Sequence, residues 1–166
     1  EQNVLPQRVN ASKIPLNLNF ERQRCRLIMN AENLFNRIAS RYDIFNSISS
    51  LGLDKYWRNK LALSLKNEKN AKVLDVACGT GDVLLSLFKN NCQIVLAAGM
   101  DLSEQMLSIA HKKLLNYKTD LRQADVVIMP YDDNCFDAVT CAFGVRNFSD
   151  LNSGLNEMFR VLKPCG

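Results

Sequence analysis

Apolar and polar residues follow two different periods along the chain, and the period changes near residue 70. Between residues 32 and 45, apolar side chains recur every three or four positions, which predicts an amphipathic helix. Its apolar face would consist of Leu34, Ile38, Tyr42 and Phe45. After Gly52 a second segment has the same spacing, with Leu53, Trp57, Leu61 and Leu65 at its apolar positions. We expect both helices to precede a sheet and to pack across it.

From residue 72 onward, short apolar runs alternate with helical segments. The runs predicted as strands are 72–77, 93–101, 120–125 and 136–144. The segments predicted as helices are 82–90, 103–115 and 149–162, and Ser103 is suited to cap the second of these. Strands separated by helices of this length form βαβ units. The pattern therefore predicts an α/β fold with a doubly wound, Rossmann-like parallel sheet.

The same pattern divides the chain into three parts. Residues 1–30 are rich in Asn, Gln and Arg and have no clear period, so we expect a poorly ordered segment. Residues 31–66 would form the N-terminal cap helices, and residues 67–166 a ligand-binding domain. No apolar run approaches the roughly 18 residues that a membrane span requires.

Charge and cysteine usage narrow the class of protein. Of the net charge of +4, residues 1–30 carry +3 and the remainder carries +1. The nearly neutral residues 31–166 argue against a nucleic-acid partner. The basic residues 1–30 are typical of a solvated tail, and the alternatives are a lipid-binding segment or a transit peptide. The six cysteines contain no CxxC pair, which favours reduced thiols. His111 is the sole histidine, so we expect no histidine-based metal site.

The stretch VLDVACGTGD, residues 73–82, ends a predicted strand in a turn with two glycines. In doubly wound sheets such a turn lies at the carboxyl ends of the strands, where ligands bind, although a plain tight turn is the alternative. A dinucleotide-binding fingerprint would have a third glycine at position 84, which is Leu84 here. Asp75 and Asp82 also bring negative charge, which suits a phosphate-free ligand with a positive centre.

Asp101 lies twenty residues after Gly81, at the end of the next predicted strand. A carboxylate there can accept hydrogen bonds from both hydroxyls of a ribose, and the alternative is a partner for the N-terminus of the following helix. A cationic adenosyl compound without phosphate is S-adenosylmethionine.

Four stretches together carry a family resemblance: VLDVACGTGD, GMDLSEQML, QADVVIMPYDDNCFDAVTCAFGVRNFSD and MFRVLKP. They resemble the class I S-adenosylmethionine-dependent methyltransferases. The stretches FNRIASRYDIFNSISSLGLDKYWR and AFGVRN are similar, more narrowly, to the ubiquinone/menaquinone biosynthesis C-methyltransferase family, and the match extends from about residue 34 to residue 166. Members of that family are transferases that methylate a quinol ring carbon.

The resemblance implies a role for each cofactor residue. The turn at Gly79 and Gly81 would hold the methionine portion, Asp101 the ribose, and Asp125 the adenine amino group, unless Asp125 only caps a strand end. Asp75 is also placed to orient the turn by accepting backbone N–H bonds. The predicted cofactor-binding residues are Asp75, Gly79, Thr80, Gly81, Asp101, Leu102, Asp125 and Val126. Met100 and Met106 are expected either to line the adenine pocket or to pack in the core.

Carbon methylation requires a base, or a cation that stabilises the phenolate of the acceptor ring. Arg146 stays protonated, so we assign it to stabilising the phenolate or holding a water; an ion pair with Asp150 is the alternative. Asn147 would orient the ring oxygens. Tyr42, supported by Asp43, would close over the methionine end of the cofactor, unless it is a core residue.

The predicted function is therefore C-methylation of a polyprenyl quinol in ubiquinone or menaquinone biosynthesis. The alternatives are methylation of another small molecule and a non-catalytic binding fragment. We expect a lipophilic quinol substrate, peripheral membrane association, and a homodimer or a quinone-biosynthesis complex. The location would be the cytoplasm, or the matrix side of the inner membrane in a mitochondrion. We also expect a sheet that is incomplete at its C-terminal end, with an open edge at residues 136–142 and no activity of this chain alone.

Overall fold

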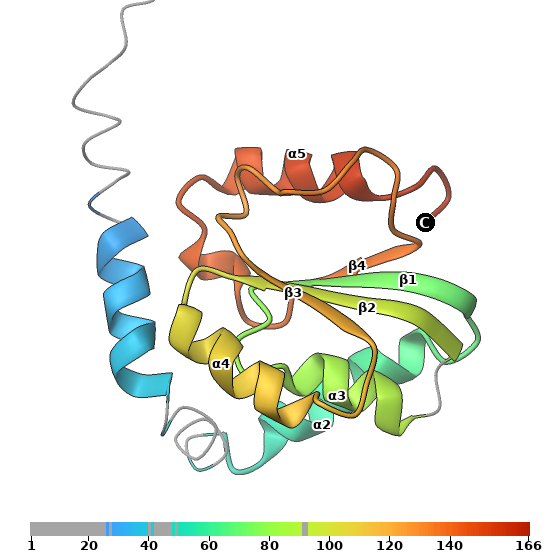
Figure 1. Cartoon of the computed structure of the whole chain (residues 1–166), viewed down its shortest axis with the longest axis horizontal. Helices are drawn as coiled ribbons and strands as arrows, with labels where there is room; N and C mark the ends of the chain where they lie inside the picture. Colours follow the sequence, from blue (N-terminus) through green and yellow to red (C-terminus); the bar gives the residue numbers. More distant parts are fainter. Residues whose placement is uncertain (1–25, 27, 40, 42–47, 49, 91–92) are drawn as a thin grey trace, which may run out of the picture.

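A computed structural model of the chain describes residues 26, 28–39, 41, 48, 50–90 and 93–166 (Figure 1). The strands are β1 (Lys69–Val76), β2 (Gln93–Asp101), β3 (Thr119–Gln123) and β4 (Ala138–Thr140). They form one parallel sheet in the order β3-β2-β1-β4. The helices are α2 (Leu53–Ser64), α3 (Asp82–Lys89), α4 (Glu104–Lys113) and α5 (Leu151–Val161), with a 3-10 turn η1 (Val145–Asn147). The predicted α/β doubly wound sheet is confirmed.

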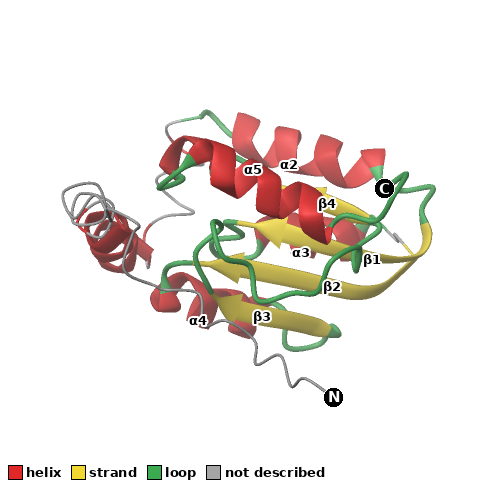
Figure 2. Cartoon of the chain, turned by 90° about the horizontal axis from the view of Figure 1, so that it is seen from above, coloured by secondary structure: helices red, strands yellow, loops and turns green. Residues whose placement is uncertain are grey.

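Helices cover both faces of the sheet. Helices α2, α3 and α4 lie on one side of the sheet, with α2 next to α3, and α5 lies on the other side (Figures 1 and 2). One apolar cluster therefore fills the space between the sheet and α3, and includes Val73, Leu84, Leu87 and Leu114. A second fills the space toward α5, and includes Leu74, Val76, Met100, Phe136 and Val161. Alternate residues of β1 supply both clusters, as the two-residue period of a strand requires.

The helix starts follow local chemistry. Ser103 precedes α4, and its side chain accepts a hydrogen bond from the Met106 N–H at 3.1 Å, so the predicted cap is confirmed. For α5 the capping residue is Asp150, whose carboxylate accepts from the Ser153 N–H at 2.7 Å. The helix consequently begins at Leu151, two residues later than predicted.

The predicted strand 136–144 is wrong at both ends, because β4 contains only three residues. Before β4, Phe136 makes an isolated bridge with Leu162, and the Asp137 carboxylate accepts from the Lys72 N–H at 2.8 Å. After β4, Phe143 has φ +67°, a left-handed conformation that no strand can contain.

The predicted apolar faces of the first two helices are confirmed only in part. Ile38, Leu61 and Leu65 are half-buried, Leu34, Leu53 and Trp57 are exposed, and Tyr42 and Phe45 lie outside the described residues. Residues 28–39 are continuously helical, so the expected boundary at residue 30 falls inside a helix, and Leu34 on it is exposed. On α2, Leu53 and Trp57 are exposed while Asp54, Arg58 and Ala62 are buried. Ion pairing accompanies the burial of the two charged residues: Arg58 donates to Asp54 at 2.6 Å and to Asp82 of α3 at 3.2 Å. Helix α2 therefore packs against α3, and its Ala62 joins the apolar cluster that contains Ala71 and Val73 of β1.

Candidate cofactor and acceptor pocket

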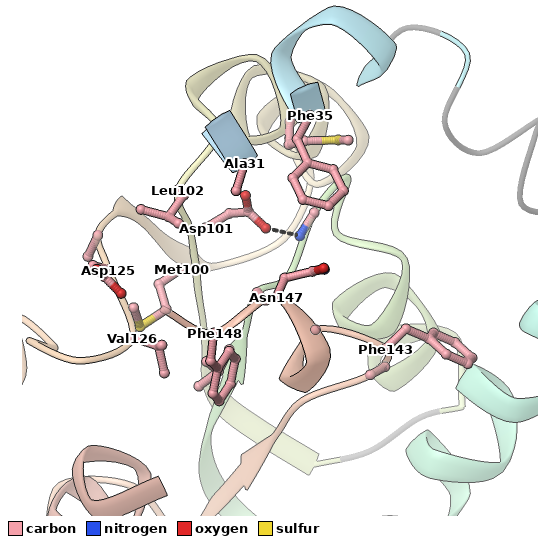
Figure 3. Close-up of a pocket in the computed structure, with 17 residues that line it drawn as sticks. Ala31, Phe35, Met100, Asp101, Leu102, Asp125, Val126, Phe143, Asn147 and Phe148 are labelled. Atoms are coloured by element: carbon pink, nitrogen blue, oxygen red, sulfur yellow. Dashed lines mark hydrogen bonds between the residues drawn. The ribbon is translucent and has the colours of Figure 1, made fainter. Parts of the chain in front are cut away.

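A pocket opens at the carboxyl ends of all four strands, where the chain leaves the sheet (Figure 3). Residues that follow β1, β2, β3 and β4 contribute to its walls, and helix 28–39 contributes Ala31 and Phe35. Because the strand order reverses its direction of growth between β1 and β4, this is the switch point at which doubly wound sheets bind ligands. The residues labelled in Figure 3 are Ala31, Phe35, Met100, Asp101, Leu102, Asp125, Val126, Phe143, Asn147 and Phe148.

The two glycines of the turn after β1 have different roles. Gly79 has φ +54° and lines the pocket, and a Cβ on it would meet no atom within 4 Å. Gly81 has φ +80° and packs against α4, where a Cβ would lie 3.0 Å from Leu114 Cδ1 and 3.1 Å from Ala110 Cβ. Gly79 therefore leaves room for a ligand at the backbone, while Gly81 permits close packing between the turn and a helix.

Asp101 connects the glycine turn to the start of α4. Its Oδ2 accepts from the Gly79 N–H at 2.8 Å (dashed in Figure 3), and its Oδ1 accepts from the Ser103 N–H at 2.9 Å. Burial raises the pKa of Asp101, and the backbone hydrogen bonds from Ser103 and Gly79 partly offset this. Each carboxylate oxygen can accept a second hydrogen bond, so the group can still bind a diol in the pocket.

The far end of the pocket combines one carboxylate with apolar side chains. Asp125 accepts from the Val127 N–H at 3.2 Å through Oδ1 and from the Ser149 hydroxyl at 3.3 Å through Oδ2. Val126, Met100 and Met106 line the same region, and the two methionines also belong to the buried interior. Such an arrangement suits a flat heteroaromatic group with a donor on its edge.

Three predicted cofactor residues do not line the pocket: Gly81, which packs against α4, and Asp75 and Thr80. Asp75 is fully enclosed within the sheet, where its Oδ1 accepts from the Thr140 hydroxyl at 2.7 Å rather than from the turn's N–H groups. Burial raises the pKa of Asp75 to about 7, with the Thr140 hydrogen bond lowering it and the charge of Asp101 raising it. Thr80 is buried beside α4 and accepts from Lys113 Nζ at 2.9 Å.

The structure describes two of the three predicted catalytic residues, and only one of them lines the pocket. Asn147 lines the pocket from η1, but Arg146 on the same turn is exposed and is not part of the wall. Tyr42 and its expected partner Asp43 lie outside the described residues.

Several pocket residues were missed by the sequence reasoning. Ala31 and Phe35 reach the pocket from helix 28–39, and Asn36 on that helix accepts a hydrogen bond from the Ser103 hydroxyl. Phe143 and Phe148 complete the wall after β4. The four-residue interval between Ala31 and Phe35 could have indicated these pocket residues, because it defines a second apolar stripe on the helix beside that of Leu34.

Among the described residues, no group of three or more His, Cys, Asp or Glu side chains is placed to hold a metal ion. No helix in the described ranges has both the length and the apolar character needed to cross a bilayer.

Comparison with known proteins agrees with this geometry. The chain is 43% identical over 137 residues to the demethylmenaquinone methyltransferase of Deinococcus radiodurans, covering 81% of this chain and 56% of that protein. It is 39% identical over 144 residues to the ubiquinone/menaquinone biosynthesis C-methyltransferase UbiE of Rickettsia typhi, with the same two coverages. The chain thus spans little more than half the length of these curated relatives.

A solved structure supports the fold independently. A putative S-adenosyl-L-methionine-dependent methyltransferase of Methanococcus maripaludis matches with a TM-score of 0.66 at 22% identity, covering 77% of this chain and 59% of that one. Finally, the sequence profile of the ubiE/COQ5 methyltransferase family matches residues 22–166, so the chain belongs to that family.

Proposed function

We propose that this pocket binds S-adenosylmethionine and that the protein methylates a ring carbon of a polyprenyl quinol in ubiquinone or menaquinone biosynthesis. The observation that carries the proposal is the position of Asp101: its carboxylate faces the pocket while both oxygens are held by the backbone beside the glycine turn. A carboxylate fixed in this way is ready to receive two ribose hydroxyls.

The residues present fit the cofactor along its whole length. The open space beside Gly79 accommodates the methionine end, and the neighbouring Leu102 contributes an apolar contact to the adenosyl portion. Asp125 can accept from the adenine amino group, while Met100 and Val126 pack on the ring faces. In dinucleotide-binding proteins a third glycine lies at the start of the first helix, where the pyrophosphate binds. The corresponding residue of α3 is the buried Leu84, so the residues present do not favour a dinucleotide.

The acceptor would enter from the side of the loop after β4. When bound, the cofactor supplies an electrophilic methyl carbon, so the protein has to align the acceptor carbon and favour the phenolate. Asn147 lines the pocket and can donate to a ring oxygen through its amide. Arg146 is exposed on the same turn and lies outside the pocket wall, so we assign it to the developing phenolate charge of an acceptor that approaches from this side. The ring proton leaves to water after the carbon–carbon bond has formed. Tyr42 is assigned to the methionine end.

Titration calorimetry tests the cofactor part of the proposal. We expect binding of S-adenosylmethionine and of its demethylated product, and at least about a hundredfold weaker binding of NAD. Asp101→Asn should raise the Kd for the demethylated product by about tenfold, because one acceptor for the ribose is replaced by a donor. Lys60→Gln on α2 is a matched control, because Lys60 is exposed and lies away from the pocket lining. Equal binding of NAD, or an unchanged Kd in the Asn variant, would contradict the assignment.

Methyl transfer is tested with isotope-labelled cofactor and two short-chain acceptors, a demethylated naphthoquinol and a demethylated benzoquinol. We expect transfer to at least one quinol and none to the oxidised quinones, because only the reduced ring provides a phenolate. Transfer to unrelated phenols or amines alone would favour the alternative of another small-molecule substrate. Cofactor binding without transfer to any acceptor would favour a non-catalytic role.

A lipophilic acceptor places the reaction at a membrane surface. We propose peripheral association with the cytoplasmic membrane of a bacterium or with the matrix face of the mitochondrial inner membrane. Flotation with liposomes that contain anionic lipid tests this, since the net charge of +4 favours such vesicles over neutral ones.

A further inference from the structure

Two loops meet at the pocket, and both contain strained backbone. The loop after β1 includes Ala77 at φ +53°, and the loop after β4 includes Phe143 at φ +67°. Gly144 packs on Ala77 so closely that a Cβ on the glycine would lie 2.5 Å from the alanine Cβ. Left-handed conformations in residues other than glycine cost free energy and gather at functional sites, where the surroundings impose them.

Phe143 is placed more like a ligand-binding side chain than a core residue. Phe143 contributes to the pocket wall near Asn147, but its ring points away from the other labelled side chains, toward Arg58 of α2, and 49% of the residue remains exposed (Figure 3). A bulky aromatic residue has no local reason to adopt a positive φ. The strain and the exposure together indicate that the ring is held at the rim of the pocket, where an acceptor that enters from the side of α2 can contact it.

Arg58 of α2 contacts the loop after β4 and the first residue of α3, which follows the loop after β1. Its guanidinium lies over the Phe143 ring, with 5.7 Å between Cζ and the ring centroid, which is within the range of a cation–π contact. The same group donates to Asp82 Oδ2 at 3.2 Å, and Asp82 directly follows the glycine turn. The Arg58 side chain is only 9% exposed, so these contacts are little weakened by solvent.

The position of Arg58 is itself determined by its neighbours. Asp54, one turn earlier on α2, accepts from Arg58 at 2.6 Å and is held in turn by the Ser50 hydroxyl at 2.9 Å. On the other side, Lys113 of α4 donates to Asp82 Oδ1 at 2.7 Å. A chain of charges thus connects α2, the first residue of α3 and α4, and Arg58 extends it to Phe143.

We propose that Phe143 is a specificity-determining residue that stacks on the planar ring of the acceptor, and that Arg58 is a positioning residue that holds the Phe143 ring in place. The inference rests on the proposed function, because it assigns the acceptor half of the same pocket. An aromatic wall selects a flat ring over an aliphatic acceptor, since offset stacking adds to the gain from apolar burial.

The experiment measures two affinities and one stability for each variant. Calorimetry gives the Kd for S-adenosylhomocysteine. In its presence, a second titration under reducing conditions gives the Kd for a short-chain demethylated naphthoquinol. Thermal unfolding followed by circular dichroism gives Tm. The variants are Phe143→Leu, Phe143→Gly and Arg58→Lys, because Arg58→Ala would leave the buried Asp54 without its ion pair and disturb folding.

We expect Phe143→Leu and Phe143→Gly to weaken quinol binding by about tenfold while the Kd for S-adenosylhomocysteine changes less than about twofold. Glycine relieves the positive φ at position 143, so Tm should stay within about 3 °C or rise, which a merely structural role for the ring would not allow. Arg58→Lys should weaken quinol binding by about threefold to tenfold, because the ammonium lacks the planar fork that reaches Asp54, Asp82 and the ring together.

Arg122→Lys is the matched control. Arg122 lies over the Tyr131 ring at 4.6 Å from its centroid, but neither residue lines this pocket, so both affinities should be unchanged. Unchanged quinol affinity in both Phe143 variants would overturn the inference, as would wild-type protein that binds S-adenosylhomocysteine but no quinol. Wild-type protein that binds neither would overturn the proposed function as well, so the two failures are distinguishable.

Discussion

Replacing Asp75 with asparagine is expected to remove much of the pH dependence of folding stability between pH 5 and pH 8. Asp75 is enclosed within the sheet, and burial raises its pKa to about 7 in the folded protein. In the unfolded chain an aspartate titrates near 3.9. Between these values the folded protein holds a proton that the unfolded chain has released, so raising the pH lowers the free energy of unfolding.

The size of the effect follows from the two pKa values. A difference of about three pKa units corresponds to about 4 kcal/mol over the whole titration. About 2 to 3 kcal/mol of this falls between pH 5 and pH 8, because part of the loss has already occurred below pH 5. In the wild type, Asp75 accepts a hydrogen bond from the Thr140 hydroxyl at 2.7 Å. Asparagine keeps an oxygen that can accept the same hydrogen bond, but it carries no ionisable proton.

Urea unfolding at constant ionic strength, followed by far-ultraviolet circular dichroism at several pH values, measures the effect. The difference between the wild-type and Asp75→Asn curves isolates this residue from other titrating groups, including Asp101. Asp137→Asn serves as the control, because hydrogen bonds from Lys163 and the Lys72 backbone lower the pKa of Asp137. Its contribution is complete above pH 5 and is lost only as the pH falls further, so its curve should parallel the wild type from pH 5 to pH 8.

Parallel curves for wild type and Asp75→Asn over this range would refute the reasoning. They would mean that Asp75 is ionised in the folded protein throughout, and that Thr140 and its surroundings compensate fully for burial.

Three further substitutions separate packing from local conformation. Gly81→Ala should lower the free energy of unfolding by about 2 to 4 kcal/mol, since a Cβ would add contact with Leu114 at 3.0 Å to the cost of a positive φ. Gly79→Ala should lower the free energy of unfolding by only about 1 to 2 kcal/mol, because Gly79 also has a positive φ but a Cβ on it would meet open space. An equal loss in both variants, measured by urea unfolding, would contradict the packing role of Gly81. Ser103→Ala should cost about 1 kcal/mol in the same assay through loss of the α4 cap, and no loss would show that another group satisfies the Met106 N–H.

Local patterns predicted much of the fold because the relevant interactions are close in sequence. Strand β2 matches the predicted run 93–101 in both of its bounds, since a continuous apolar run can be buried on both faces of a parallel sheet. The cap at Ser103 needs only three consecutive peptide units, and the glycine turn requires positive φ whatever surrounds it. The proximity of Asp101 to Gly79 followed from adjacent parallel strands, whose carboxyl ends lie at one edge.

Spacing could not distinguish pocket residues from their buried neighbours in the same motif. Asp75 and Gly79 are only four residues apart, but the last residues of β1 face alternate sides of the sheet, so Asp75 turns into the interior toward Thr140. Asn147 and Arg146 are adjacent, and a 3-10 turn directs one to the pocket wall and leaves the other in solvent. Such differences depend on backbone direction after the strand ends.

By itself, the sequence determined the βαβ order, the glycine turn and the family, because these depend on periodicity and on residues close together in the chain. The tertiary structure alone decided which face of α2 is buried. A hydrophobic scale favours burial of Leu53 and Trp57, but Asp82, 24 residues beyond Arg58, supplies a partner that makes burial of the charged face favourable. The pocket wall at Phe143 and Phe35 was decided in the same way, by segments that meet only after the sheet has formed.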